Sequence, residues 1–187
     1  MSSNRKERDQ RCLERLCEGD ENAFKRLFLA YYEDLCRLAS QYGLTDEEVE
    51  DRVQEVFLEI WRRRESLDPE KSIRAYLYAA TRNEALKSKK RQKKGAKRHS
   101  SEPDISESAN SNDPVLAFRR REFEAEVEKA LNALPDRRRE IFLLSRRHGL
   151  TYQEIASLLE ISIKTVETQM GRALTNLEDH LSVLLSE

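Results

Sequence analysis

The sequence contains little glycine, proline or cysteine: 5, 4 and 3 of its 187 residues. A collagen-like chain needs far more glycine, and a small disulfide-stabilised scaffold needs more cysteine. No apolar run approaches the roughly 20 residues that a membrane-spanning helix needs. Charged residues, by contrast, make up 37% of the chain, against about 25% in an average protein. Many long charged side chains with few chain-breaking residues favour an all-α protein.

The residue groups that enzymes and metalloproteins use are also missing. The sequence has no glycine-rich phosphate loop, no cluster with metal-ligand spacing and no nucleophile constellation. Its cysteines, Cys12, Cys17 and Cys36, have neither CxxC spacing nor a histidine nearby, so we expect no zinc site and no disulfide framework. We therefore expect a protein that is not an enzyme, with no catalytic residue, no metal and no cofactor.

Two features bear on the compartment. Three unpaired cysteines suit a reducing cytoplasm. The first ten residues, MSSNRKERDQ, lack the apolar core of a signal peptide. We therefore expect a cytoplasmic protein that does not insert into a membrane.

The charges are unevenly distributed. The formal net charge is −1, which by itself argues against a nucleic-acid partner. Residues 1–84 carry a net charge of −4 and residues 100–187 a net charge of −5, whereas residues 85–99 contain eight basic and no acidic residues. Such a stretch attracts polyanions at short range whatever the total charge, because salt screens charges beyond about 8–10 Å. A solvated linker would look the same, so the stretch alone leaves both interpretations open.

Three amphipathic helices are predicted in the first part of the chain. The first follows the N-cap Asp20, the second opens with a capping box of Thr45 and Glu48, and the third is capped by Ser72. Because these helices can share one core, we expect an independent helical domain over residues 1–94. The three apolar stripes consist of Phe24, Leu27, Phe28, Tyr31, Leu35, Leu38 and Tyr42; of Val49, Val53, Val56, Phe57 and Ile60; and of Ile73, Tyr76, Leu77, Ala80 and Leu86.

Residues 95–114 have a different composition. They are rich in Ser, Asn, Asp and Pro and almost free of apolar residues, so they cannot bury enough surface to offset the entropy of ordering. We expect a flexible linker here, followed by a second helical domain over residues 115–187.

The second domain is predicted to contain four helices. Pro135 ends the first, Asp136 is the expected cap of the next, and Gly149 ends that helix. Thr151 and Glu154 form another capping box, after which the last helix follows.

Residues 151–172 are the candidate for a helix-turn-helix motif. Their apolar positions can lock a short helix against a second helix that Ser162 caps. The N-terminal part of such a second helix fits a major groove about 12 Å wide. An ordinary helical hairpin would have similar apolar spacing. Glu160 also occupies a turn position where glycine is common, because left-handed backbone costs other residues about 1–2 kcal/mol.

The whole chain resembles a known family, the extracytoplasmic-function sigma factors of the bacterial σ70 class, which contain only regions 2 and 4. The resemblance covers about residues 20–94 and 120–181. It rests on the segments DRVQEVFLEIW (51–61) and IRAYLYAATRN (73–83), and on L-x-x-L-P, R-E-I-F and Y-x-E-I-A between residues 131 and 156.

The resemblance implies a sigma factor that binds core RNA polymerase and recognises the −10 and −35 promoter elements. Region 2 (1–94) would bind the β′ clamp helices and the −10 element, and region 4 (115–187) the −35 element. The expected contacts to the clamp helices are Asp51, Gln54, Glu55, Phe57 and Trp61, although Phe57 and Trp61 equally suit core positions.

The resemblance also implies DNA contacts. On the −10 side, stacking faces and polar edges would receive an extruded base, and lysines would hold phosphates. Tyr76 shares a core stripe and equally suits burial. The expected −10 contacts are Tyr76, Tyr78, Arg82, Asn83, Lys87, Lys89, Lys90 and Arg91. The expected −35 contacts are Lys164, Thr165, Glu167, Thr168, Gln169 and Arg172.

Further partners remain expectations. Arg137, Arg138 and Arg139 suit contact with DNA phosphate or with the polymerase β flap, and equally suit a solvated face. By resemblance we expect an anti-sigma factor, and we expect no homo-oligomer. The alternative function is a helix-turn-helix regulator of another class, but residues 1–90 show no alternating apolar strands of a receiver domain.

Overall fold

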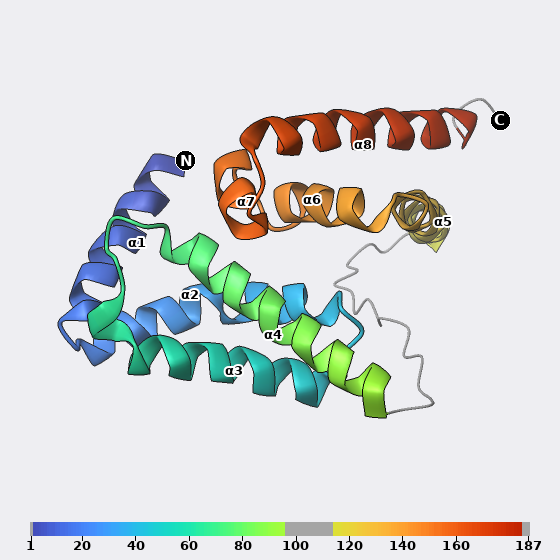
Figure 1. Ribbon diagram of the computed structural model, residues 1–187. Helices are drawn as coiled ribbons and strands as arrows, with labels where there is room; N and C mark the ends of the chain where they lie inside the picture. Colours follow the sequence, from blue (N-terminus) through green and yellow to red (C-terminus); the bar gives the residue numbers. More distant parts are fainter. Residues whose placement is uncertain (1, 96–113, 185–187) are drawn as a thin grey trace. The chain divides into compact units, whose positions relative to one another are not determined.

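The computed structural model describes residues 2–95 and 114–184, and all the elements in these ranges are helical (Figure 1). The chain divides into two compact units, Met1–Asp104 and Ile105–Glu187. Nearly all of the linker expected over 95–114 lies outside the described residues. Within the described ranges, no helix has both the length and the apolar character needed to cross a bilayer. The all-α expectation is confirmed.

The first unit is built around α2, which contacts α1, α3 and α4. Its largest fully buried side chains come from all four helices and include Leu16, Tyr31, Leu35, Ile60 and Leu77. A short 3₁₀ helix, η1, follows α3 and contacts α1. The helices of this unit are α1 (Ser2–Cys17), α2 (Glu21–Ser40), α3 (Asp46–Arg62), η1 (Arg64–Ser66) and α4 (Ile73–Gly95).

Helix α1 was not among the sequence predictions. It packs on α2 through Leu13 and Leu16, both of which are buried. The Tyr31 hydroxyl donates a hydrogen bond to the Asp9 carboxylate, and the Arg5 guanidinium lies 5.2 Å from the Tyr31 ring centroid. Burial, together with the Asp9 charge, raises the pKa of Tyr31. Two leucines and a few polar groups thus hold α1 against α2. Two apolar positions are too few to form an amphipathic pattern that predicts a helix from the sequence.

The predicted helix starts of the first unit are confirmed. Asp20 accepts the backbone N–H of Asn22 at 2.8 Å, and Ser72 Oγ accepts the backbone N–H of Ala75 at 3.2 Å. Thr45 and Glu48 form both bonds of the capping box. The backbone N–H of Thr45 lowers the pKa of Glu48 by stabilising the carboxylate.

The second unit contains four helices around a small core. Helix α8 packs against α5, α6 and α7. Ile141, Ile155 and Val166, from three of these helices, are completely buried. The helices are α5 (Pro114–Asn132), α6 (Asp136–Arg146), α7 (Tyr152–Leu159) and α8 (Ile163–Leu184).

Helices α7 and α8 form the predicted helix-turn-helix. The capping box of Thr151 and Glu154 is present, and Ser162 Oγ accepts the backbone N–H of Thr165 at 3.0 Å. Between the helices, Glu160 is left-handed, with φ 53° and ψ 46°. The turn therefore keeps its expected backbone without a glycine.

The predicted cap of α6 is wrong. Asp136 is the first residue of the helix, Pro135 holds the cap position, and no side chain caps the helix. The Asp136 carboxylate instead accepts a hydrogen bond from Arg139 at 3.0 Å. A carboxylate in the first turn still favours the helix through the macrodipole.

Candidate nucleic-acid and polymerase interfaces

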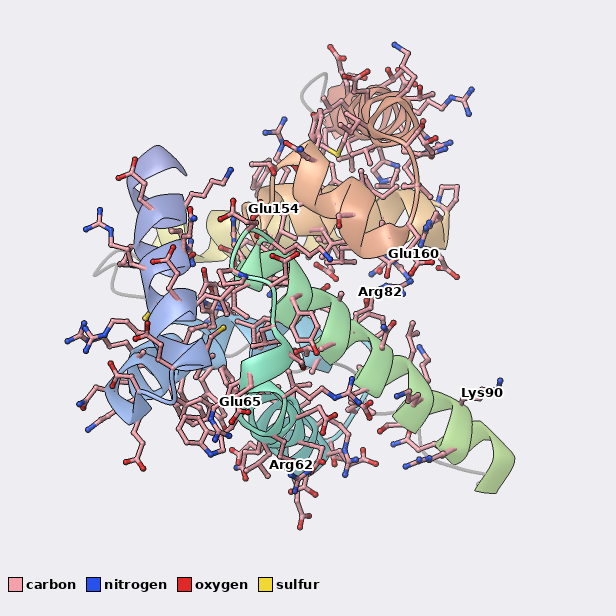
Figure 2. All side chains as sticks on the ribbon, turned by 60° about the vertical axis from the view of Figure 1, so that its left-hand side comes forward. Arg62, Glu65, Arg82, Lys90, Glu154 and Glu160 are labelled. Carbon is pink, nitrogen blue, oxygen red and sulfur yellow. The ribbon has the colours of Figure 1, made fainter. Side chains whose placement is uncertain are left out.

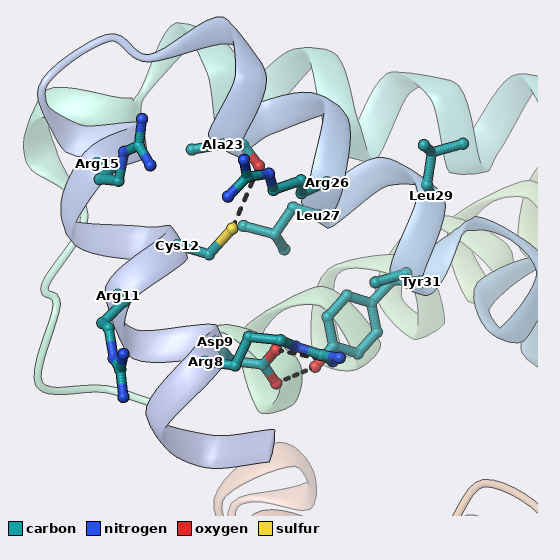
Figure 3. Close-up of a pocket in the computed structure, with 11 residues that line it drawn as sticks. Arg8, Asp9, Arg11, Cys12, Arg15, Ala23, Arg26, Leu27, Leu29 and Tyr31 are labelled. Atoms are coloured by element: carbon teal, nitrogen blue, oxygen red, sulfur yellow. Dashed lines mark hydrogen bonds and ion pairs between the residues drawn. The ribbon is translucent and has the colours of Figure 1, made fainter. Parts of the chain in front are cut away.

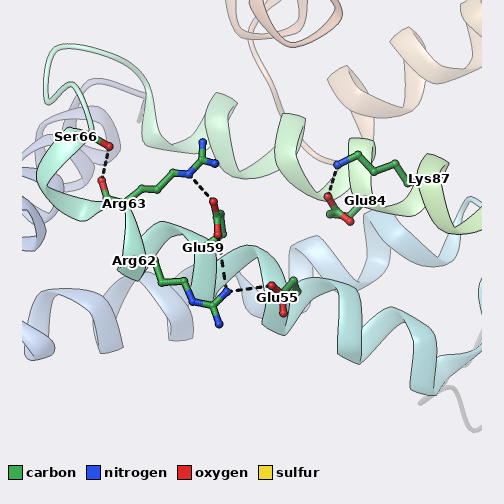
Figure 4. A network of polar contacts seen from close by, with 7 residues as sticks. All are labelled: Glu55, Glu59, Arg62, Arg63, Ser66, Glu84 and Lys87. Carbon is green, nitrogen blue, oxygen red and sulfur yellow. Dashed lines mark hydrogen bonds and ion pairs between the residues drawn. The ribbon is translucent and has the colours of Figure 1, made fainter.

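One exposed face of α4 carries an aromatic ring followed by an amide and two lysines. Tyr76, Asn83, Lys87 and Lys90 are all exposed, and their spacings of seven, four and three residues place them on the same side of a helix. Tyr76 is 39% exposed, so part of its ring is accessible although most of its surface is buried, as its stripe position allowed. Lys87 pairs with Glu84 at 2.7 Å (Figure 4). This face, the α4 face, can stack a base and hold phosphates.

Tyr78 lies on the opposite side of α4 and is fully buried. The Arg74 guanidinium lies 5.6 Å from its ring centroid, and burial raises the pKa of its hydroxyl. A ring with no exposed surface cannot stack on a base, so in this structure Tyr78 is a core residue of the first unit. Arg82 is half-buried, whereas Lys89 and Arg91 are exposed beside the α4 face (Figure 2 labels Arg82 and Lys90).

Most of the predicted −35 residues lie on the outer side of α8. Lys164, Thr165, Glu167, Thr168 and Arg172 are exposed. The Lys164 ammonium lies 3.5 Å from the Glu167 carboxylate. The exposed face of this helix end therefore contains an acidic group beside its basic one. The Thr168 hydroxyl donates to the backbone carbonyl of Lys164 at 2.8 Å, so its oxygen remains available only as an acceptor for a base or phosphate.

Gln169 and the nearby arginines are engaged within the second unit. The Gln169 side-chain oxygen accepts a hydrogen bond from Arg138 at 3.3 Å, and Gln169 is half-buried. Arg137 donates to the backbone carbonyl of Leu159 at 3.1 Å, and Arg139 donates to Asn132 at 2.9 Å. These contacts connect α6 with α5, α7 and α8. The arginines thus have structural partners, which the sequence did not indicate.

The outer face of α3 is acidic and includes one exposed leucine. Asp51, Gln54 and Glu55 are exposed, and Glu55 accepts a hydrogen bond from Arg62 at 3.3 Å (Figure 4). Leu58, one turn further along the helix, is 47% exposed. Sequence reasoning missed Leu58, although its offset from the Val53, Val56, Phe57 and Ile60 stripe was a usable signal. An apolar side chain among polar ones is a typical interface anchor.

The two aromatic residues of α3 differ. Phe57 is 2% exposed and packs against Phe28 at 4.9 Å between ring centroids, so it occupies the core position that its place in the sequence also allowed. Trp61 is half-buried, lies 5.2 Å from the Phe24 ring, and has the Arg64 guanidinium 4.7 Å from its own ring centroid. Trp61 therefore keeps part of its surface accessible.

The cysteines form no site of their own. Cys12, Cys17 and Cys36 are half-buried free thiols, and burial raises the pKa of each. Across residues 2–95 and 114–184, no group of three or more His, Cys, Asp or Glu side chains could hold a metal ion.

Comparisons with family models match both units. Residues 27–95 match Sigma-70 region 2, and residues 124–177 match Sigma-70, region 4. The chain is 27% identical to the RNA polymerase sigma-H factor of Pseudomonas aeruginosa over 188 residues, which cover 97% of each chain. It is also 27% identical to the ECF RNA polymerase sigma-E factor of Escherichia coli K12, over 95% of this chain and 96% of that one.

Two solved structures share the fold. CnrH, in complex with the cytosolic domain of CnrY, has a TM-score of 0.67 and 23% identity over 94% of this chain and 98% of its own. The sigma factor RpoE from Bartonella quintana, in complex with the anti-sigma factor NepR, has a TM-score of 0.63 and 23% identity over 86% of this chain and 97% of its own.

Proposed function

Because this chain belongs to the extracytoplasmic-function branch of the sigma-70 family, we propose that it binds core RNA polymerase and directs initiation at promoters with −10 and −35 elements. The observation that carries the proposal is the order of the two matched regions, with region 2 on the first unit and region 4 on the second. A helix-turn-helix regulator of another class does not account for the match over 27–95.

The −10 element binds the α4 face as a single strand. Tyr76 supplies a stacking surface, Asn83 supplies a donor and an acceptor for a base edge, and Lys90 supplies positive charge for phosphate. Arg82, Lys87, Lys89 and Arg91 add charge beside them. Tyr78 contributes indirectly, by holding α4 against the core.

The N-terminal half of α8 binds in the major groove of the −35 element. Lys164 and Arg172 contact phosphates or guanine edges, and Thr165 and Thr168 add short polar contacts. Glu167 repels phosphate but accepts a hydrogen bond from cytosine N4. The bond from Arg138 occupies the side-chain oxygen of Gln169, so its amide N–H groups remain available to donate to a base.

Core polymerase binds the outer face of α3. Asp51, Gln54 and Glu55 complement a basic partner surface such as the β′ clamp helices. Leu58 provides an apolar anchor, and Trp61 adds the accessible part of its surface. Polymerase supplies the catalytic chemistry, so the chain itself is not an enzyme. It acts in the cytoplasm, where core polymerase is found. The complexes of CnrH and RpoE motivate an anti-sigma factor as a regulatory partner.

Core binding tests the proposal directly. Replacing Asp51, Glu55 and Leu58 with alanine should weaken binding to core polymerase about 10- to 100-fold, as expected for two charged contacts and one apolar anchor. Glu33→Ala removes an exposed acidic residue from α2 and is the control. Titration of fluorescently labelled protein with core enzyme measures both. Equal affinity of the triple variant and the control would reject the α3 face as the polymerase surface.

A further inference from the structure

A groove of about 750 Å³ lies between α1 and α2, away from every residue assigned above to polymerase or promoter DNA (Figure 3). Both walls come from the first unit. The groove is lined by Arg8, Asp9, Arg11, Cys12, Arg15, Ala23, Arg26, Leu27, Leu29, Ala30 and Tyr31.

The α2 side of the groove presents apolar surface. Leu29 is 70% exposed, the largest exposure among the large hydrophobic side chains that the structure describes. Ala30 is exposed beside it, and Leu27 and Ala23 are buried at the base. The Cys12 thiol points across from α1 and donates to the Ala23 carbonyl at 3.5 Å. Burial of such exposed leucine surface by a partner favours binding, because it removes apolar area from water.

The rim of the groove is positively charged. Four arginines line it, against a single carboxylate, Asp9. Arg8, Arg11 and Arg15 have side chains that are 62%, 75% and 54% exposed, and each has an acidic neighbour within 4 Å. Exposed pairs of this kind stabilise a protein little, so a guanidinium can exchange its neighbour for a partner carboxylate at small cost. Arg26 makes no ion pair among the described residues.

We propose that this groove, the α1–α2 groove, binds an acidic amphipathic segment of a protein partner. The apolar side chains of that segment cover Leu29 and Ala30, and its carboxylates pair with the guanidiniums of Arg11 and Arg26. Arginine suits this role because its planar fork can bind a carboxylate with two parallel hydrogen bonds.

The chemistry of the groove favours a peptide over nucleic acid. Its exposed apolar surface, Leu29 and Ala30, is best covered by apolar side chains, which a phosphate backbone lacks. Its aromatic ring, Tyr31, is fully buried and offers no stacking surface. Leucine and alanine give a base or phosphate no hydrogen bond.

The proposal is tested with the full chain and a designed probe. The probe is a fluorescein-labelled helical peptide with leucine on one face and glutamate on both flanks; a second peptide carries lysine in place of each glutamate. Fluorescence anisotropy measures binding. We expect the glutamate peptide to bind and the lysine peptide not to bind. Leu29→Asp, and Arg11→Glu combined with Arg26→Glu, should each weaken binding at least about tenfold.

Lys25→Glu is the matched control, because Lys25 is exposed on α2 next to Arg26 yet does not line the groove. It should change the affinity by less than about twofold. Circular dichroism checks that each variant is folded, which is expected since all the replaced side chains are exposed. Three results would overturn the proposal: no binding by the unmodified chain up to about 1 mM, equal binding of both peptides, or equal loss in Lys25→Glu. Displacement of the peptide by a single-stranded oligonucleotide would assign the groove to nucleic acid instead.

Discussion

Replacing Glu160 with glycine should stabilise the second unit. Glu160 has φ 53° and ψ 46° in the turn between α7 and α8. Left-handed backbone costs a non-glycine residue about 1–2 kcal/mol, which glycine avoids. This gain is partly offset because glycine loses more backbone entropy on folding, which costs about 0.5–1 kcal/mol. The substitution also removes an acidic side chain from the C-terminal end of α7, where it is unfavourable by about 0.3–1 kcal/mol. Together the three contributions give an expected gain of about 0.3–2.5 kcal/mol, with a midpoint of roughly 1.4 kcal/mol.

The single tryptophan makes the assay specific to one unit. Trp61 lies in the first unit, so its fluorescence follows the unfolding of that unit, whereas helical circular dichroism follows both. In urea, Glu160→Gly should raise the midpoint of the circular dichroism transition and leave the Trp61 transition unchanged. On heating, 1 kcal/mol corresponds to about 4–8 °C for a unit of this size.

Paired controls isolate the backbone contribution. Glu160→Ala removes the charge but keeps the left-handed strain, so it should be less stable than Glu160→Gly by about 1 kcal/mol. At Ser157, an exposed position inside α7, the order should reverse, with alanine better than glycine by about 1 kcal/mol. If alanine equals or exceeds glycine at position 160, the assigned strain at this turn is refuted.

Other substitutions test the remaining assignments. Tyr76→Ala should weaken binding of a −10 single strand by about 1–3 kcal/mol and destabilise the first unit less than Tyr78→Ala, which should cost about 3–5 kcal/mol in urea unfolding. Gly171→Ala, in α8 with open space around its Cβ, should stabilise the second unit by about 0.5–1 kcal/mol. The pKa of Glu48 is lowered in the folded state, so its stabilisation is complete above its unfolded pKa and is lost as the pH falls through the folded value. Glu48→Gln should thus lower stability at pH 7 but not at pH 2, and a constant difference would contradict this.

Local signals predicted most helix boundaries. The capping boxes at Thr45 and Thr151 and the caps at Asp20 and Ser162 are present, because a cap depends on side chains a few residues apart. Helix α1 has no such signal. Buried Leu13 and Leu16 and the hydrogen bond from Tyr31 to Asp9 hold it against α2. These contacts join residues that only the tertiary structure brings together.

Within one motif, the sequence did not distinguish the buried residues from the exposed ones. Tyr76 and Tyr78 are two positions apart on α4, and the apolar stripe favoured burial of Tyr76, yet Tyr78 is the buried one. The reason lies in packing, because Arg74, Asp34 of α2 and Arg5 of α1 lie near Tyr78. Similarly, the family resemblance pointed to Phe57 and not to Leu58, whereas Phe57 is buried in the core and Leu58 is exposed.

In vitro transcription tests the central claim most directly. Purified protein is added to core RNA polymerase on fragmented genomic DNA from its own organism, and RNA 5′ ends are mapped with and without it. The account predicts new start sites that share a −10 and a −35 element, and their loss when Asp51, Glu55 and Leu58 are replaced with alanine. Failure to bind core polymerase, or binding without any new start site, would contradict it.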